Sequence, residues 1–564
     1  MSSAALVTLA AMLVLAGLVA RFARPRNAST LDFYLAGQRV GIVTNACAIC
    51  GDYFSAASFL GVAAAVYASG LDGVWYATGF AAGFVPVLLF VAAPLRRFGE
   101  FSIPDFLGRR LESEGVRLVA VGVVQLVILS YLVPQAVGSG LTWELLVGAR
   151  IGGLSPYASG VLVSTVVITA VVVLGGMRGT TWTQAVQFLL LLAVLLWLTA
   201  LVLGSGFSYP RAVESISAEP LETPVVVDGE WRLDAPASLL NPDEPMRFDE
   251  PGARYGRLGQ FALVITLVLG TAGLPHVMNR YFTSPSGTAT RMTTVWVLGL
   301  AGLFYALAVL LGTAARAIVP GAVANRPWLE ALTIDGVLRV PEHALLALGR
   351  IYGGSTGLGL IATGALVAVM STIAGLLLAA AASWGHDVYE RHINPRATQR
   401  QAVRAGRTAV ILVSGLSAAG ALGLQPESLA AEFPSIIATM VTWAFALAGS
   451  ALTPVFILTI WWRRTTAAGA CAGMAVGACT SVAMFAAGLT IGSTASDDLG
   501  SLLLTPTLLA APLALLVTVA VSRWTRAPAH VERSWLLMHG TARDREAERL
   551  ARLTIRGVSR EGTR

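Results

Sequence analysis

Lysine is absent from this chain of 564 residues, and charge of either sign is scarce. All 39 basic residues are arginine; together with 32 acidic residues they make up only 13% of the sequence, whereas hydrophobic residues make up 55%. A soluble protein carries charge at roughly 25% of its positions. The composition therefore excludes a soluble multidomain enzyme and a disordered chain, and it is typical of a protein that crosses a membrane many times.

Cysteine is also rare, with four residues in the chain, which excludes a disulfide framework. Cys47 and Cys50 form a C-x-x-C pair inside an apolar run, without a second pair at zinc-finger spacing. We interpret them as core-filling residues. The sequence also lacks a nucleophile-elbow serine, a metal-spaced histidine cluster and a nucleotide-binding loop, so we expect no enzymatic activity.

Apolar stretches long enough for a spanning helix of about 20 residues recur along the chain. The first, Ala4–Ala20, has no basic segment before it and is followed by arginines, so we expect a retained helix with its N-terminus outside. Twelve further stretches lie at residues 41–70, 73–95, 117–147, 155–175, 182–204, 259–279, 292–319, 347–384, 408–424, 433–462, 465–491 and 502–522. The sequence thus predicts an all-α polytopic membrane protein with about 13 transmembrane helices.

The charges alternate between the two sets of loops that this count defines. Cytoplasmic loops would carry Arg24, Arg26, Arg39, Arg96, Arg97, Arg109, Arg110, Arg178, Arg280, Arg291, Arg391, Arg396, Arg400, Arg404, Arg463 and Arg464. Outside loops would carry Asp72, Arg150, the mixed loop 320–346, Glu427, Glu432, Asp497 and Asp498. We interpret the net charge of +7 as a consequence of this positive-inside pattern and not as a sign of nucleic-acid binding. The prediction is a multi-pass protein of the plasma or inner membrane with a cytoplasmic C-terminus.

The span count also divides the chain into parts. Residues 1–22 would form an extra N-terminal helix, and residues 463–523 two C-terminal helices. Residues 41–204 and 259–462 would form two halves of five helices each. Because each half has an odd number of spans, the two halves would lie in opposite orientation in the membrane. Between them lies an acidic external insert, 205–258, with a short hairpin predicted at Val225–Arg232 around Asp228 and Gly229. Residues 524–564 would form a basic cytoplasmic tail, in which we interpret Arg543–Arg556 as solvated instead of lipid-bound.

The first helix of each half contains a predicted break. Residues 50–58 (CGDYFSAAS) place a polar stretch with one carboxylate between apolar flanks. Residues 270–276 (GTAGLPH) include Pro275, which removes a helical hydrogen bond. Secondary transporters bind ions and substrates where helices are interrupted at matching positions of two inverted halves. These breaks therefore predict a transport site.

Few side chains near the breaks have charged or polar groups that could bind an ion or a substrate. Asp52 needs a cation or a polar partner, because a charge inside a membrane costs roughly 2.5–3.5 kcal/mol; a structural, hydrogen-bonded acid is the alternative. His276 could sense protons, bind a carboxylate or cap a helix. In the ninth span, the hydroxyls of Ser371 and Thr372 and the carbonyl of Ala368 can converge on a hard cation. Adjacent Ser and Thr more often bond to their own helix backbone.

Four strings in this chain resemble the sodium:solute symporter family, and within it the cation/acetate or monocarboxylate permeases. They are residues 51–61 (GDYFSAASFLG), 175–184 (GGMRGTTWTQ), 270–276 (GTAGLPH), and Met370-Ser371-Thr372 followed by His386-Asp387-Val388-Tyr389. The third string also resembles the Gly-x-Pro-His segment of proline permeases. The resemblance runs from about residue 30 to residue 525 and implies a LeuT-like fold of 5+5 inverted repeats, with one extra N-terminal and two C-terminal helices.

The resemblance also implies a site. Sodium would be bound by the carbonyl oxygens of Gly51, Phe54 and Ala368 and by the hydroxyls of Ser371 and Thr372. Residues that flank the ion or bind and gate the substrate would be Asp52, Tyr53, Ser55, Leu267, Thr271, Pro275 and His276. Neither Leu267 nor Thr271 carries an aromatic ring, which favours a small polar solute over a sugar.

The function implied is secondary active symport, in which inward Na⁺ movement drives uptake of a short-chain monocarboxylate (acetate, propionate or pyruvate) by alternating access. We expect no cofactor and no transition metal, with Na⁺ as the coupling ion and membrane lipid as surroundings. A proton-coupled monocarboxylate symporter acting through Asp52 and His276 and a proline-like sodium/amino-acid symporter are alternatives. A transporter-like sensor is a third, against which the short tail after residue 525 argues.

Overall fold

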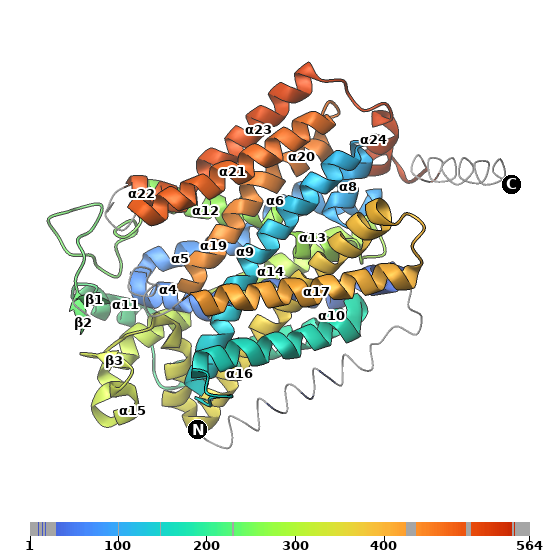
Figure 1. Ribbon diagram of the computed structural model, residues 1–564. Coiled ribbons are helices and arrows are strands. Elements are labelled where there is room, and N and C mark those ends of the chain that lie inside the picture. The colour runs from blue at the N-terminus through green and yellow to red at the C-terminus, as the bar shows by residue number, and fades with distance from the viewer. Residues whose placement is uncertain are drawn as a thin grey trace, which may run out of the picture.

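A computed structural model of the chain describes residues 30–99, 101–146, 148–227, 230–424, 436–491 and 498–543, with single residues at 10, 14, 17 and 546. These residues form a bundle of long helices, with two short hairpins close together at one end (Figure 1). This confirms the all-α class. The helix predicted at Ala4–Ala20 is described only at its three single positions, and nearly all of Arg543–Arg556 lies outside the described residues.

The first half begins with two short helices and continues with a broken one. Its elements are α2 (Thr30–Leu35), η1 (Ala36–Gln38), α3 (Ile42–Tyr53), η2 (Ala57–Gly61), α4 (Val62–Ser69), η3 (Gly70–Gly73), α5 (Val74–Ala82), α6 (Phe84–Pro86), η4 (Val87–Val91), α7 (Ala92–Phe98), α8 (Ile103–Arg110), α9 (Glu114–Leu146) and α10 (Pro156–Gly204). The insert that follows holds α11 (Tyr209–Ser217), β1 (Thr223–Val227) and β2 (Glu230–Asp234).

The second half repeats the pattern of a broken first helix followed by long ones. Its elements are α12 (Gly256–Gly273), α13 (Pro275–Tyr281), α14 (Gly287–Ala322), η5 (Val323–Asn325), α15 (Pro327–Glu330), β3 (Thr333–Ile334), β4 (Val337–Leu338), η6 (Pro341–His343), α16 (Ala344–Ala382), η7 (Ser383–Ile393), α17 (Gln399–Gly423), α19 (Ile436–Leu447), η8 (Ala448–Leu452) and α20 (Thr453–Trp461). The C-terminal elements are α21 (Ala467–Ile491), α22 (Asp498–Leu504), α23 (Thr507–Trp524) and α24 (Val531–His539).

Ten helices among the described residues are long and apolar enough to cross a membrane. α10 contains two predicted spans, and the helix from Ala57 to Phe98 contains one and part of another. α10 has 49 residues, about 74 Å at the helical rise, more than twice the ~30 Å hydrocarbon core. It kinks at Gly176, whose φ of 58° favours glycine. The helix from Ala57 to Phe98 likewise turns at Gly70–Gly73. The count of thirteen spans stays a prediction, because the first helix is not fully described.

The insert folds onto the turn between α4 and α5. Its predicted hairpin is confirmed, since β1 and β2 pair antiparallel with Val225 opposite Arg232; the turn at Asp228 and Gly229 lies outside the described residues. Asp72 anchors the end of the insert by accepting the backbone N–H groups of Gly252 (2.6 Å) and Arg254 (2.8 Å).

The C-x-x-C pair lies within α3. Cys47 is 7% exposed and Cys50 is fully buried, and both are free thiols. The two sulfur atoms therefore pack in the apolar core, which confirms the structural interpretation of the pair.

Candidate functional site

The first predicted break is present in the structure. α3 ends at Tyr53, and the chain leaves helical geometry at Phe54, with φ −79° and ψ 84°. The helix resumes at Ala56, whose backbone N–H donates to the side-chain oxygen of Gln135 on α9 (3.2 Å). Gln135 thereby satisfies a donor that the interruption leaves without an intrahelical partner.

The second predicted break is also present. α12 ends at Gly273, Leu274 is extended with ψ 116°, and α13 begins at Pro275. A residue before proline is pushed out of helical geometry by the ring, and proline itself is well suited to a first helical position. The break therefore follows directly from the local sequence.

Tyr53 joins the two breaks. Its hydroxyl lies 3.0 Å from the carbonyl of Phe80, to which it can donate, and 2.8 Å from the hydroxyl of Thr271 on α12. The Thr271 hydroxyl in turn lies 2.8 Å from the carbonyl of Leu267 one turn earlier. Three of the predicted substrate or gating residues are thus brought into one chain of contacts between the halves.

Asp52 forms a buried ion pair with Arg280 on α13. Its Oδ2 lies 3.1 Å from the Arg280 Nε, and the two side chains are 0% and 1% exposed. Arg280 also donates to the hydroxyl of Thr181 (2.6 Å) and to the side-chain oxygen of Gln184, both on α10. The expectation that Asp52 has a cation or polar partner is confirmed, and the partner comes from the opposite half.

The positive-inside pattern assigned Arg280 to a cytoplasmic loop, and the structure corrects this assignment. α13 continues for seven residues after the break and carries Arg280 into the interior, where the Asp52 carboxylate compensates its charge. Arg110, also assigned to a loop, is part of α8 and fully buried. The positive-inside pattern therefore counted at least two arginines that are buried, and the orientation of the termini stays a prediction.

Gly375 on α16 makes room for the ion pair. A Cβ atom at this position would overlap the Asp52 carboxylate, which Arg280 holds in place. We expect Gly375→Ala to push Asp52 away from Arg280. Overpacking of this kind costs about 1–3 kcal/mol, so uptake should fall by about tenfold or more.

Uptake by the Gly375→Ala variant can be measured in proteoliposomes and compared with that of Gly299→Ala. Gly299 lies in α14, where an added Cβ meets nothing within 4 Å, so this control should keep its uptake. Normal uptake by Gly375→Ala would show that the carboxylate is not confined as the structure indicates.

The residues predicted to bind sodium lie on two elements that the structure brings together. The Thr372 hydroxyl donates to the carbonyl of Asp52 (2.8 Å), which fastens α16 to the end of α3. The Ser371 hydroxyl is 1% exposed and has no hydrogen-bond partner among the described residues. Neither hydroxyl therefore bonds to its own helix backbone. Ligation by these hydroxyls and by the carbonyls of Gly51, Phe54 and Ala368 stays a prediction.

Aromatic rings surround the breaks, contrary to the expectation drawn from Leu267 and Thr271. The rings, whose neighbouring centroids lie 4.7–6.2 Å apart, belong to Tyr53, Phe80, Phe84, Tyr131 and Phe445. They come from α3, α5, α6, α9 and α19, so their convergence depends on packing between helices distant in sequence. The absence of rings at two positions of α12 therefore does not argue against a sugar.

Two polar side chains beside the breaks have unused hydrogen-bonding atoms. His276 is 2% exposed, and neither of its ring nitrogens has a hydrogen-bond partner within the described parts of the chain. It forms no side-chain cap on α13, so the capping alternative lacks support. Gln135 is fully buried and its Nε2 is likewise unpartnered. It lies one turn from Tyr131, whose ring centroid is 5.5 Å from that of His276.

The other predicted residues, Ser55 and Pro275, are buried at the first and second breaks. Sequence reasoning missed Gln135, Gln184 and Arg280. Gln184 ends the string at residues 175–184 that carries the family resemblance. Arg280 follows His276 by four residues, which places both on one helical face, and an intramembrane aspartate calls for such a cation.

Comparison with known proteins agrees with this geometry. The model of the sodium:solute symporter family matches residues 33–477. The chain is 32% identical over 481 residues to the uncharacterized symporter YwcA of Bacillus subtilis, covering 85% of each protein. It is also 32% identical over 474 residues to a monocarboxylic acid transporter of Corynebacterium glutamicum, covering 81% of this chain and 79% of the relative.

Solved structures share the fold. A substrate-bound, outward-open Na⁺-coupled sialic acid symporter aligns with a TM-score of 0.69 at 17% identity, covering 93% of this chain and 99% of that one. Mhp1, a nucleobase-cation-symport-1 family transporter, aligns with a TM-score of 0.50 at 14% identity, covering 91% and 100%. These likenesses confirm the LeuT-like architecture. With a family match over most of its length, the chain belongs to the sodium:solute symporter family.

Proposed function

We propose that this sodium:solute symporter couples Na⁺ entry to uptake of a short-chain monocarboxylate such as acetate, propionate or pyruvate. The observation that carries the proposal is a pair of buried side chains beside the helix breaks, His276 and Gln135. Both ring nitrogens of His276 and the Nε2 of Gln135 have no hydrogen-bond partner among the described residues. Imidazole and amide N–H groups are neutral donors suited to a carboxylate. The Corynebacterium glutamicum relative, described as a monocarboxylic acid transporter, supports the same substrate class.

The surroundings of these donors suit a small amphipathic anion. The aromatic rings around the breaks offer an apolar face to a methyl or ethyl group. A cavity of about 480 Å³ beside the start of α3 is lined by Arg39, Arg178 and Thr181, among others. Thr181 also bonds to Arg280. A basic cavity of this kind would attract an anion leaving or entering the site.

The contacts of Asp52 favour Na⁺ over H⁺ as the coupling ion. Arg280 lies 3.1 Å from Asp52, and a cation at this distance favours the charged carboxylate, which opposes its use as a proton carrier. The Ser371 hydroxyl and nearby carbonyls are neutral oxygen ligands of the type that hard cations prefer. Bound Na⁺ would hold α3 against α16 and complete the substrate site before the helix bundle rocks against its scaffold and opens the site inward.

Uptake of labelled acetate into proteoliposomes tests the substrate class. Propionate and pyruvate should compete with acetate, whereas proline should not, and uptake should require Na⁺ at every pH tested. Competition by proline alone would favour the amino-acid alternative. Uptake driven by a pH gradient without Na⁺ would favour the proton-coupled one.

Variants of the two donors test their role. Hydrogen bonds to a charged group contribute about 1.5–3 kcal/mol, so His276→Phe and Gln135→Glu should each raise the KM for acetate by about 10- to 150-fold. Gln135→Glu keeps the oxygen that accepts the Ala56 N–H, but it removes the donor and repels an anion. His276→Gln, which retains a donor, should recover part of the affinity. Unchanged KM values in both variants would place the substrate elsewhere.

A further inference from the structure

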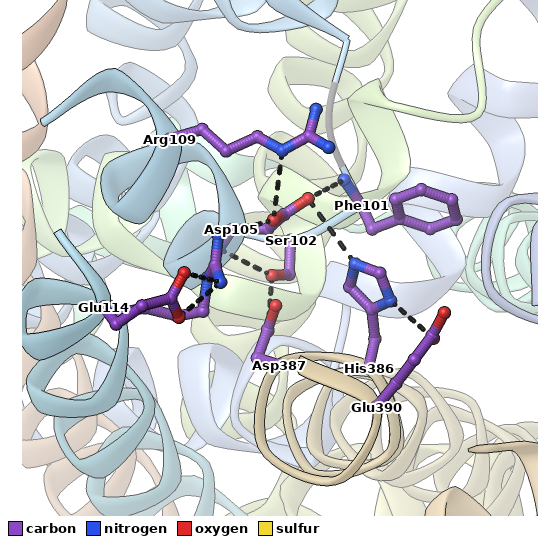
Figure 2. A network of polar contacts seen from close by, with 9 residues as sticks. Phe101, Ser102, Asp105, Arg109, Glu114, His386, Asp387 and Glu390 are labelled. Atoms are coloured by element: carbon purple, nitrogen blue, oxygen red, sulfur yellow. Dashed lines mark hydrogen bonds and ion pairs between the residues drawn. The ribbon is translucent and has the colours of Figure 1, made fainter. Parts of the chain in front are cut away.

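A buried cluster of charged side chains lies at the far end of α16, away from the helix breaks. Figure 2 shows Asp105 of α8 facing His386 and Asp387 of η7. The two aspartates are fully buried and His386 is 3% exposed. One ligand-type atom from each of the three residues lies within 4.8 Å of the other two. An imidazole nitrogen with two carboxylates is a common ligand set for divalent transition metals.

Two atoms of the cluster make no hydrogen bond among the described residues. They are His386 Nε2 and Asp387 Oδ1, and both are buried. His386 Nε2 lies 3.6 Å from Asp105 Oδ2, an ion-pair distance when the ring is protonated, and the three candidate ligand atoms lie within 4.8 Å of one another. Two ligands bound to zinc at its usual distances are about 3.0–3.4 Å apart, so the three side chains would draw closer together on binding.

Each candidate ligand is also oriented by a neighbour through its other polar atom. His386 Nδ1 is 2.9 Å from Glu390 Oε2, Asp387 Oδ2 accepts from Ser102 Oγ at 2.6 Å, and Asp105 Oδ1 accepts from Arg117 Nη2 at 3.2 Å. Metal sites use such outer contacts to fix the ligand orientation, and a carboxylate behind a histidine is their commonest form. Asp105 Oδ2 also accepts from the Phe101 N–H at 3.4 Å, and a bound ion would share this oxygen with that donor.

We propose that Asp105, His386 and Asp387 form a site for a divalent transition metal, of which Zn²⁺ is the best match. The nitrogen ligand disfavours Mg²⁺ and Ca²⁺, which prefer oxygen alone. Because α8 belongs to the first half and η7 ends α16 of the second, the bound ion would cross-link the two halves. The sequence predicts no transition metal, because Asp105 lies too far along the chain from His386 and Asp387 to form a recognisable ligand spacing.

Zinc binding to the purified, chelator-treated full-length protein tests the proposal directly. Calorimetry should detect one high-affinity Zn²⁺ per chain that excess Mg²⁺ does not displace. His386→Asn and Asp387→Asn should each weaken binding by about 100-fold or more, and Glu390→Gln, which alters only the outer contact, by about 10- to 100-fold. His392→Asn is the matched control, because His392 is exposed on the same segment; it should bind zinc normally.

A second readout separates lost binding from lost folding. Zn²⁺ should raise the unfolding temperature of the wild type and of His392→Asn, but not that of Asp387→Asn. Should His386→Asn fail to fold, Glu390→Gln still decides the matter, because Glu390 is only partly buried. The proposal is overturned if the wild type binds no zinc, if Glu390→Gln and Asp387→Asn bind it as tightly as the wild type, or if His392→Asn abolishes binding.

Discussion

Replacement of Arg280 by methionine is expected to destabilise the protein by about 3–5 kcal/mol and to abolish uptake. Removal of one partner of a buried ion pair leaves the other charge uncompensated, and this costs more than the pair contributes when intact. Asp52 is 0% exposed and would lie beside an apolar side chain without the cation that compensates its charge. The unfolding of purified protein, followed together with acetate uptake, measures both effects.

The double variant Asp52→Asn with Arg280→Met separates the effect of an uncompensated charge from the effect of the changed side-chain shape. Without either charge, most of the lost stability should return, because the desolvation penalty disappears. Arg291→Met on α14, where Arg291 is exposed, is the matched single control and should leave stability unchanged. An Arg280→Met protein as stable as the wild type would show that Asp52 has another compensating partner.

Removal of both hydroxyls from the predicted sodium ligands is expected to raise the half-saturating Na⁺ concentration by about 100-fold or more. Each oxygen that contacts a charged species contributes about 1.5–3 kcal/mol, and Ser371→Ala with Thr372→Ala removes two. Ser371→Ala by itself is a clean test, because this hydroxyl has no hydrogen-bond partner among the described residues. Acetate uptake measured against Na⁺ concentration gives the result.

Two controls accompany the sodium test. Thr372→Ser keeps the hydroxyl that donates to the Asp52 carbonyl and should retain Na⁺ dependence. Thr363→Ala removes another buried hydroxyl of α16 that has no hydrogen-bond partner in the described parts of the chain, and it should have little effect on Na⁺ dependence. Unchanged sodium dependence in the double alanine variant would rule out Ser371 and Thr372 as ligands.

The helix breaks were predictable because their causes are local. Pro275 cannot continue a helical hydrogen-bond pattern, and it pushes Leu274 into an extended conformation; the structure shows this break. The polar stretch around Asp52 likewise marked the end of α3 near Tyr53. The hairpin of the insert followed from Asp228 and Gly229, a residue pair typical of two-residue hairpin turns, and its strands pair as expected.

The partners of the residues at these breaks were not predictable in the same way. Charge alone predicts a loop position for Arg280. Its burial depends on Asp52, which lies 228 positions away in the sequence. The aromatic rings around the breaks come from five helices, and no spacing within one helix reveals them. Gln135 belongs to a span without any break of its own, yet it caps the interrupted helix.

By itself, the sequence determined that this protein spans a membrane, where its helices are interrupted and to which family it is similar. Each of these depends on properties of short segments, namely the length of an apolar run, the backbone geometry of proline and the cost of an isolated charge in the membrane. Only the tertiary structure decided that Asp52 pairs with Arg280, that Thr372 meets the Asp52 carbonyl, and that Asp105 lies beside His386. These pairings join residues from opposite halves, so they exist only once the two inverted halves pack together.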